Sequence, residues 1–451
     1  MGVMRLRHTM RRTCVLGALL LCGVSNAQSQ AADLVTVYVN AIENNAAYRS
    51  AVMQYNAALE ARPAARGKLL PQLGVQADYD WIRQEVDGTY YGFPAINSSD
   101  NFERYLYGAA LSQTIFRMDQ FIDLKKADSQ IGQARLALAT AKDELQVGVA
   151  KAYFALLGAQ ETLISVRAEK EAVGRQLDQM QGRFDSGMVA DADLKAAQSR
   201  QDLVLAQEIS AENEVEIART QIELVSGRLF ADVETLPADV PLPALEYDRV
   251  ENWIDRAMQH NLPLLEQTLV AHIAGLEYDK ARSKRLPQID LLGTYAFFDQ
   301  DGSISGARED LDERIGVSVT LPIYSGGQIS TGIRYADKLW KSEQALLENA
   351  RAQALQSTRS GFLNARSALA RSHALENAVQ SAIAAEEAAQ VGFDVGTRTQ
   401  AELLNAVRER YAAQRDFALA RYAYLLSTLE LKQAAGKLTA ADLDEINSML
   451  R

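Results

Sequence analysis

The sequence predicts a mixed α and β fold that contains two copies of one unit, and three patterns carry the prediction. The segment KLLPQL at 68–73 returns 216 residues later as KRLPQI at 284–289, which indicates a tandem duplication. Apolar residues recur at every seventh position over long stretches, which is typical of helices that pack along their length. Four short segments alternate between apolar and polar residues, which indicates strands with one apolar face.

The first 27 residues predict a secretory signal peptide. They carry four arginines, an apolar centre at 15–24 and small residues up to Ala27, a pattern too short for a spanning helix. Both cysteines of the chain, Cys14 and Cys22, fall inside this segment, so the mature chain is expected to hold no disulfide. Without the four arginines the net charge falls from −11 to −15, which leaves no electrostatic basis for binding nucleic acid.

The rest of the chain predicts two repeats, at 28–231 and 247–451, joined by a linker at 232–246. Each repeat is expected to hold helices, two strands and a long helical hairpin, and the second repeat ends in a further C-terminal segment. The expected strands lie at about 70–83, 103–116, 286–298 and 313–324, and the expected hairpins at about 118–227 and 328–436.

The seven-residue period predicts that the hairpins pack as coiled coils. Counting by sevens from Leu124 to Met180 gives nine apolar residues, and counting from Trp340 to Ala389 gives small or apolar residues throughout. Such a period is needed only by helices that stay in contact. The many small residues at these positions predict that the helices approach one another closely.

Glycines are expected to end the helices. Gly187 and Gly396 lie where the period breaks, so a left-handed residue is expected at each hairpin turn. Gly227 and Gly436 lie at the same spacing of 209 residues, and they are expected to end the returning helices.

The apolar faces of the four strands carry aromatic residues near the loops, which matches an interfacial girdle on strands that face lipid. These residues are Tyr79, Trp81, Tyr105, Tyr107, Tyr295 and Phe297. Two amphipathic hairpins on a soluble core would show the same alternation. Polar loops at 83–103 and 299–313 favour the membrane interpretation, since they suit exposed outer turns. Four strands cannot close a membrane barrel, which needs about eight, so several chains would have to share one.

Five segments occur in order along the chain: KLLPQL at 68–73, SQTIF at 112–116, RQLDQ at 175–179, LPIYSGG at 321–327 and VGTRT at 395–399. With these segments the chain resembles the TolC-type outer membrane factors, the trimeric channel-tunnels of Gram-negative bacteria. The resemblance implies a homotrimer with one shared outer membrane barrel, a long periplasmic α-helical barrel, and a C-terminal segment in an equatorial belt. It also implies a passive exit duct for efflux or type I secretion, engaged by a periplasmic adaptor and an inner-membrane transporter.

The same resemblance implies a gate at the periplasmic tip. Arg398 would bond Asp193 on the neighbouring hairpin, while Phe393 stands where the family has a tyrosine, so the hydroxyl of that latch is missing. Glu402 would constrict the pore, and Asn405 replaces the second carboxylate of the constriction. The adaptor would contact the two hairpin turns, at Gly187, Met188, Val395, Gly396 and Thr397.

No pattern in the chain predicts an enzyme, a cofactor or a metal site. His260, His272 and His373 are not spaced with carboxylates as metal ligands would be. No phosphate-binding glycine loop or nucleophile motif is present in the sequence. The alternative function is a periplasmic coiled-coil adaptor or scaffold without a membrane barrel. The sequence does not distinguish small-molecule cargo from protein cargo.

Overall fold

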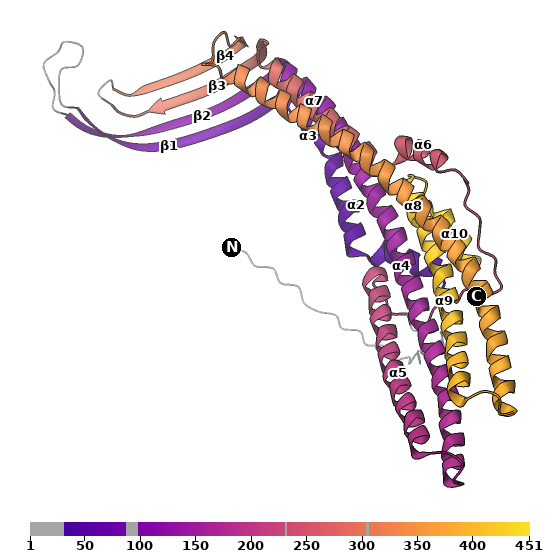
Figure 1. Ribbon diagram of the computed structural model, residues 1–451. Helices are drawn as coiled ribbons and strands as arrows, with labels where there is room; N and C mark the ends of the chain where they lie inside the picture. Colours follow the sequence, from indigo (N-terminus) through magenta and orange to yellow (C-terminus); the bar gives the residue numbers. More distant parts are fainter. Residues whose placement is uncertain (1–30, 87–97, 231, 304–305) are drawn as a thin grey trace, which may run out of the picture.

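The computed structural model describes residues 31–86, 98–230, 232–303 and 306–451, so the predicted signal peptide lies outside the described residues. The molecule is elongated (Figure 1). A curved sheet forms one end, a column of helices forms the body, and the turns of two helical hairpins form the other end. In the described part of the chain, no helix is long and apolar enough to cross a membrane.

The sheet has four antiparallel strands in the order β1 (Gln72–Val86), β2 (Ser98–Phe116), β3 (Gln288–Gln300) and β4 (Arg308–Thr320). Each repeat therefore contributes one hairpin, and β2 pairs with β3 across the two repeats. Because paired residues share a face, the register places the predicted apolar residues of all four strands on one side. This apolar face is open in the single chain, with Val75 84% exposed and Ile315 80% exposed.

The strand boundaries differ from the sequence prediction. On the helix side β1 and β3 begin two residues later than predicted, β2 ends at Phe116 as predicted, and β4 ends at Thr320 rather than near 324. On the loop side they run further, so that residues 98–102 and 308–312 are strand rather than loop. The added residues are mostly polar, with only Phe102 and Leu311 apolar, so they lack the apolar alternation by which a half-buried strand is recognised. Cross-strand pairing places these residues in the sheet instead, as where Asn101 pairs with Arg83 and Asp310 pairs with Phe298.

Two long hairpins form the body, α4 (Met118–Asp185) with α5 (Asp191–Ser226) and α8 (Gln328–Asp394) with α9 (Gln400–Ala434). The residues that recur at every seventh position, from Leu124 to Met180 in α4 and from Trp340 to Ala389 in α8, are all buried or half-buried. This confirms that one face of each long helix packs against its neighbours. At 1.5 Å per residue, the 68 residues of α4 and the 67 of α8 each span roughly 100 Å. Each long helix therefore runs from the sheet to the tip without a break.

Shorter helices complete each repeat, with α1 (Leu34–Asn44), α2 (Ala46–Leu59) and α3 (Ala61–Gly67) in the first and α6 (Val250–His260) and α7 (Leu262–Ser283) in the second. One asparagine in each repeat joins two helix ends. Asn45 accepts from the Tyr48 amide at the start of α2 and donates to the Val225 carbonyl at the end of α5. Asn261, 216 residues later, repeats this arrangement between α7 and α9, so α5 abuts α2 and α9 abuts α7.

Glycine is required at both junctions. Gly227 and Gly436 adopt φ of 69° and 64°, a conformation that other residues rarely adopt. A Cβ at Gly227 would lie 2.4 Å from the Asn44 side chain, and one at Gly436 would lie 2.0 Å from the His260 carbonyl. The predicted role of these glycines as helix ends is confirmed, and their second role is to let the next helix approach.

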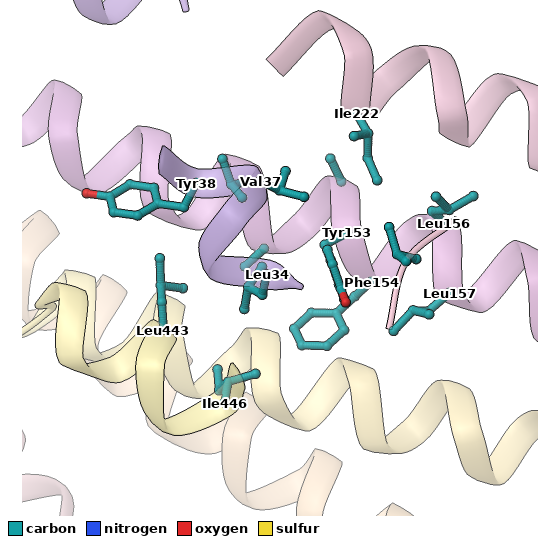
Figure 2. Packing of buried hydrophobic residues seen from close by; sticks show 14 of the residues in the cluster. Leu34, Val37, Tyr38, Tyr153, Phe154, Leu156, Leu157, Ile222, Leu443 and Ile446 are labelled. Atoms are coloured by element: carbon teal, nitrogen blue, oxygen red, sulfur yellow. The ribbon is translucent and has the colours of Figure 1, made fainter. Parts of the chain in front are cut away.

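A belt surrounds the middle of the body. The linker runs across α4 and α9, where Tyr153 donates to the Glu234 carbonyl and Arg421 donates to the Pro237 and Val240 carbonyls. The C-terminal helix α10 (Ala440–Asn447) packs on α1, and the largest apolar core gathers side chains from α1, α4, α5, α9 and α10 (Figure 2). This core fixes the two repeats to each other halfway between the sheet and the tip.

Candidate functional site

The two hairpin turns have the same geometry. After α4, the Gly187 amide donates to Phe184 and the Met188 amide donates to Arg183, and residues 392–397 repeat the pattern after α8. This is the Schellman arrangement, and Gly187 and Gly396 supply its left-handed residue with φ of 71° and 78°. The five residues expected to contact an adaptor are all exposed, and the apolar side chains of Met188 and Val395 are 69% and 68% exposed.

Phe393 joins the two hairpins within one chain. Its ring packs against an apolar cluster from three long helices, made of Ala172, Ala389, Leu403, Ala406 and Val407. The Arg183 guanidinium on α4 lies over this ring, with its central carbon 5.0 Å from the ring centroid. A cation–π contact therefore forms at the position where the resemblance implies a tyrosine hydroxyl. Arg183 could not be predicted from the sequence, because no local pattern relates it to a residue 210 positions away.

Arg398 and Asp193 do not form an ion pair within the chain. Asp193 is exposed in the first turn of α5, and it lines a small pocket with Asn405 from α9. The Arg398 side chain lies along Gly392, where an added Cβ would come within 2.9 Å of the Arg398 Cγ. Both side chains are exposed.

Glu402 caps α9. Its carboxylate accepts from the Thr399 amide at 2.7 Å, while the Thr399 hydroxyl accepts from the Glu402 amide, which forms a capping box. The amide of Thr399 holds the pKa of Glu402 below its usual value. The T-x-x-E signal for this box is present at 399–402, although the sequence analysis considered Glu402 only as a pore residue. Glu402 and Asn405 are both exposed one turn apart on α9.

The six aromatic residues predicted for a lipid interface lie on one face of the sheet. Tyr79 and Tyr105 are directly paired across β1 and β2, with ring centroids 5.1 Å apart. Tyr107 and Phe297 are paired across β2 and β3, with ring centroids 6.4 Å apart. The row of rings thus crosses from the first repeat into the second.

The four-stranded sheet, the long helical hairpins and their turns can now be compared with known proteins. The family described as outer membrane efflux protein matches residues 37–228 and 253–437, one segment in each repeat. The chain belongs to this family. The outer membrane protein TolC of Vibrio cholerae is 32% identical over 432 residues, which cover 95% of this chain and 96% of that protein. TolC of Escherichia coli is 32% identical and covers 97% of this chain and 88% of its own length.

More distant relatives agree. The alkaline protease secretion protein AprF of Pseudomonas aeruginosa is 27% identical and covers 97% of this chain and 91% of its own length. The solved structure of the Campylobacter jejuni CmeC outer membrane channel has a TM-score of 0.76 at 17% identity, covering 93% of this chain and 90% of that one. The Vibrio cholerae outer membrane protein VceC has a TM-score of 0.73 at 18% identity, covering 89% of this chain and 96% of that one, and both likenesses support the fold.

The family membership decides between the two functions that the sequence left open. The chain is an outer membrane protein with a large periplasmic helical part, and it serves as an exit duct for efflux and secretion. A periplasmic adaptor without a membrane part is not favoured, since the relatives that match nearly the whole chain are outer membrane and secretion proteins. Transport rather than catalysis is the function that these relatives indicate.

Proposed function

We propose that three copies of this chain form one passive exit duct, with a shared twelve-stranded barrel in the outer membrane and a helical tunnel in the periplasm. The observation that carries the proposal is the open sheet. β1 and β4 are edge strands, and an unpaired edge in lipid leaves backbone groups without partners. Three sheets of four strands joined edge to edge would remove every edge and turn the apolar faces outward.

The tip supports a gate. In this proposal Asp193 and Arg398 pair between adjacent copies, since both are exposed and neither has an ion pair within the described chain. An exposed pair of this kind is worth about 0.2–1 kcal/mol. The exposed turns around Met188 and Val395 would receive a periplasmic adaptor, which would bring an inner-membrane transporter to the tip.

The assembly is tested by measuring the mass of the detergent-solubilised protein. We expect a species of three chains that keeps its strand content. A folded species of one chain with full strand content would contradict the shared barrel.

The gate is tested by single-channel conductance in planar bilayers. Arg398→Ala and Asp193→Ala should each raise conductance, and the double variant should add little because both changes remove one interaction. Conductance at the wild-type level in Arg398→Ala would remove the ion pair from the gate.

A further inference from the structure

A pocket of about 470 Å³ lies between α4, α7, α8 and α9, at the level where α9 abuts α7. Its volume is in the range of pockets that hold small organic ligands. Three carboxylates line it: Asp143 and Glu144 from α4, and Glu430 from α9. No lysine or arginine is among the lining residues, and the other polar groups there are amides and hydroxyls.

Asp143 is the unusual member of this lining. It is 9% exposed, and it has neither a hydrogen bond nor an ion pair in the described chain. The Thr140 hydroxyl, one turn earlier in the same lining, is also buried without a partner. A largely buried carboxylate without a hydrogen-bond partner is costly, because burial removes most of the water that would solvate its charge. A positively charged ligand in the pocket would supply the missing partner.

The position of Glu430 connects the pocket to the predicted pore face. Counting by sevens along α9 from Glu402 gives Glu409, Asp416, Ala423 and Glu430. A seven-residue step keeps side chains on one face of a packed helix, and none of these five residues is buried. The resemblance implies that Glu402 constricts the pore of the proposed duct, so we expect Glu430 on the same face and the pocket open toward it.

We infer that this pocket binds a small organic cation, with the Asp143 carboxylate as its charge partner and Glu144 and Glu430 at its wall. The inference deepens the proposed function, since it rests on the pore face and names a class of compound that the duct would hold in passage. A metal ion fits less well. Within the described residues, no group of three or more histidine, cysteine or acidic side chains is arranged to hold one. A protonated amine needs only one close carboxylate and can use the surrounding amides and hydroxyls.

Binding should also depend on pH. Burial raises the pKa of Asp143 to about 6, so the carboxylate that pairs with the cation is present above that pH and is lost below it. The charged and titratable groups near Asp143 are Lys142 and Glu144 on its own helix, Tyr38 on α1 and Glu430 on α9. α7 and α8 contribute no titratable side chain to the lining.

Equilibrium dialysis of the full-length protein in neutral detergent tests the inference with benzylammonium as probe and benzyl alcohol as its uncharged analogue. Wild-type protein should bind benzylammonium and hardly bind the alcohol at pH 7.5, and the preference should fall at pH 5. Asp143→Asn keeps the shape of the side chain, and it should weaken benzylammonium binding about tenfold or more, because a desolvated charge-assisted contact is lost. Glu430→Gln, at the exposed wall, should weaken it less.

Glu409→Gln is the matched control, since it removes a carboxylate from the same face of α9 about six turns away from Glu430 and the pocket. Its binding should equal that of the wild type. Equal binding of benzylammonium to wild type and Asp143→Asn would overturn the inference, and so would equal binding of the amine and the alcohol. Wild-type conductance in bilayers is measured separately. If the wild-type protein forms channels but does not bind benzylammonium, the binding pocket is refuted and the proposed duct is not. If it binds benzylammonium but forms no channels, the proposed duct is refuted.

Discussion

The contact between Arg183 and Phe393 offers a sharp test of how the tip is held. Arg183→Gln removes the cation but keeps a long polar side chain on an exposed helix position. Phe393→Tyr keeps the ring and adds the hydroxyl that the TolC-type pattern would have. The two changes should act in opposite directions on the arrangement of the hairpins, because the first removes a contact between α4 and α8 and the second adds a donor there.

The magnitude follows from the geometry. A cation–π contact at an exposed site is worth about 0.5–1 kcal/mol, and the 5.0 Å separation lies within its range. Three copies that move together would lose roughly 1.5–3 kcal/mol. Since 1.4 kcal/mol is a factor of ten, the balance between the described tip and an opened one should shift by roughly 10- to 150-fold.

The assay is single-channel recording in planar bilayers. Arg183→Gln should lengthen the time spent at high conductance, while Phe393→Tyr should stay at or below the wild-type level. Arg175→Gln is the control, since Arg175 lies on the same helix and pairs only with Glu171 one turn away. If Arg183→Gln and Arg175→Gln behave alike, the guanidinium over the ring does not hold the tip, and the apolar cluster around Phe393 must do so alone.

Three further predictions concern the junction, the pocket and the sheet. Asn261→Ala should lower the free energy of unfolding by about 1–2 kcal/mol, because the cap of α7 and the hydrogen bond to the end of α9 are both lost. Asn45→Ala should lower it by a similar amount. Denaturant unfolding measures both variants, and an unchanged free energy of unfolding would show that the asparagine does not stabilise the two helix ends. Because burial raises the pKa of Asp143 from 3.8 to about 6, the native state binds its proton more tightly than the unfolded chain does, so stability falls as pH rises through this window. The change in Tm between pH 5 and pH 7.5 should therefore be smaller in Asp143→Asn, and an unchanged difference would show that Asp143 does not titrate there. In outer membranes, a cysteine at Asp78 should react faster with a membrane-impermeant thiol reagent than one at Val75, although Val75 is the more exposed in the single chain. Faster reaction at Val75 would contradict the prediction that the apolar face of the sheet contacts lipid.

The sequence predicted those features that repeat along the chain. The two copies, the seam of α4 and α8, the turns at Gly187 and Gly396 and the single apolar face of the sheet all follow from periods of seven and two. The loop-side strand ends were misplaced because the loop-side residues of β2 and β4 are mostly polar, with a single apolar residue in each, Phe102 and Leu311. Such segments resemble loop when their cross-strand partners are not known.

Contacts between residues far apart in the chain could not be predicted. Asn45 lies 180 residues from the carbonyl it binds, and Arg183 lies 210 residues from the ring beneath it. The burial of Asp143 could not be predicted either, since no pattern in the neighbouring residues of the chain indicates it. Burial depends on which helices pack around a position, and that is a property of the assembled fold.

The joined helices have a mechanical consequence. In each repeat one long helix, α4 or α8, is continuous from the sheet to the tip. Beside it lie two separate helices, α2 and α5 or α7 and α9, which are joined by one asparagine side chain and a glycine. Two helices that meet at a junction can rotate relative to each other, whereas a continuous helix has to bend. We therefore expect α5 and α9 to rotate about Asn45 and Asn261 when the tip moves. The upper arms α2 and α7 would then stay in place, and displacement at one end of the molecule would be damped before it reached the sheet. A joint of this kind lets the same scaffold be compliant at one end and stiff at the other.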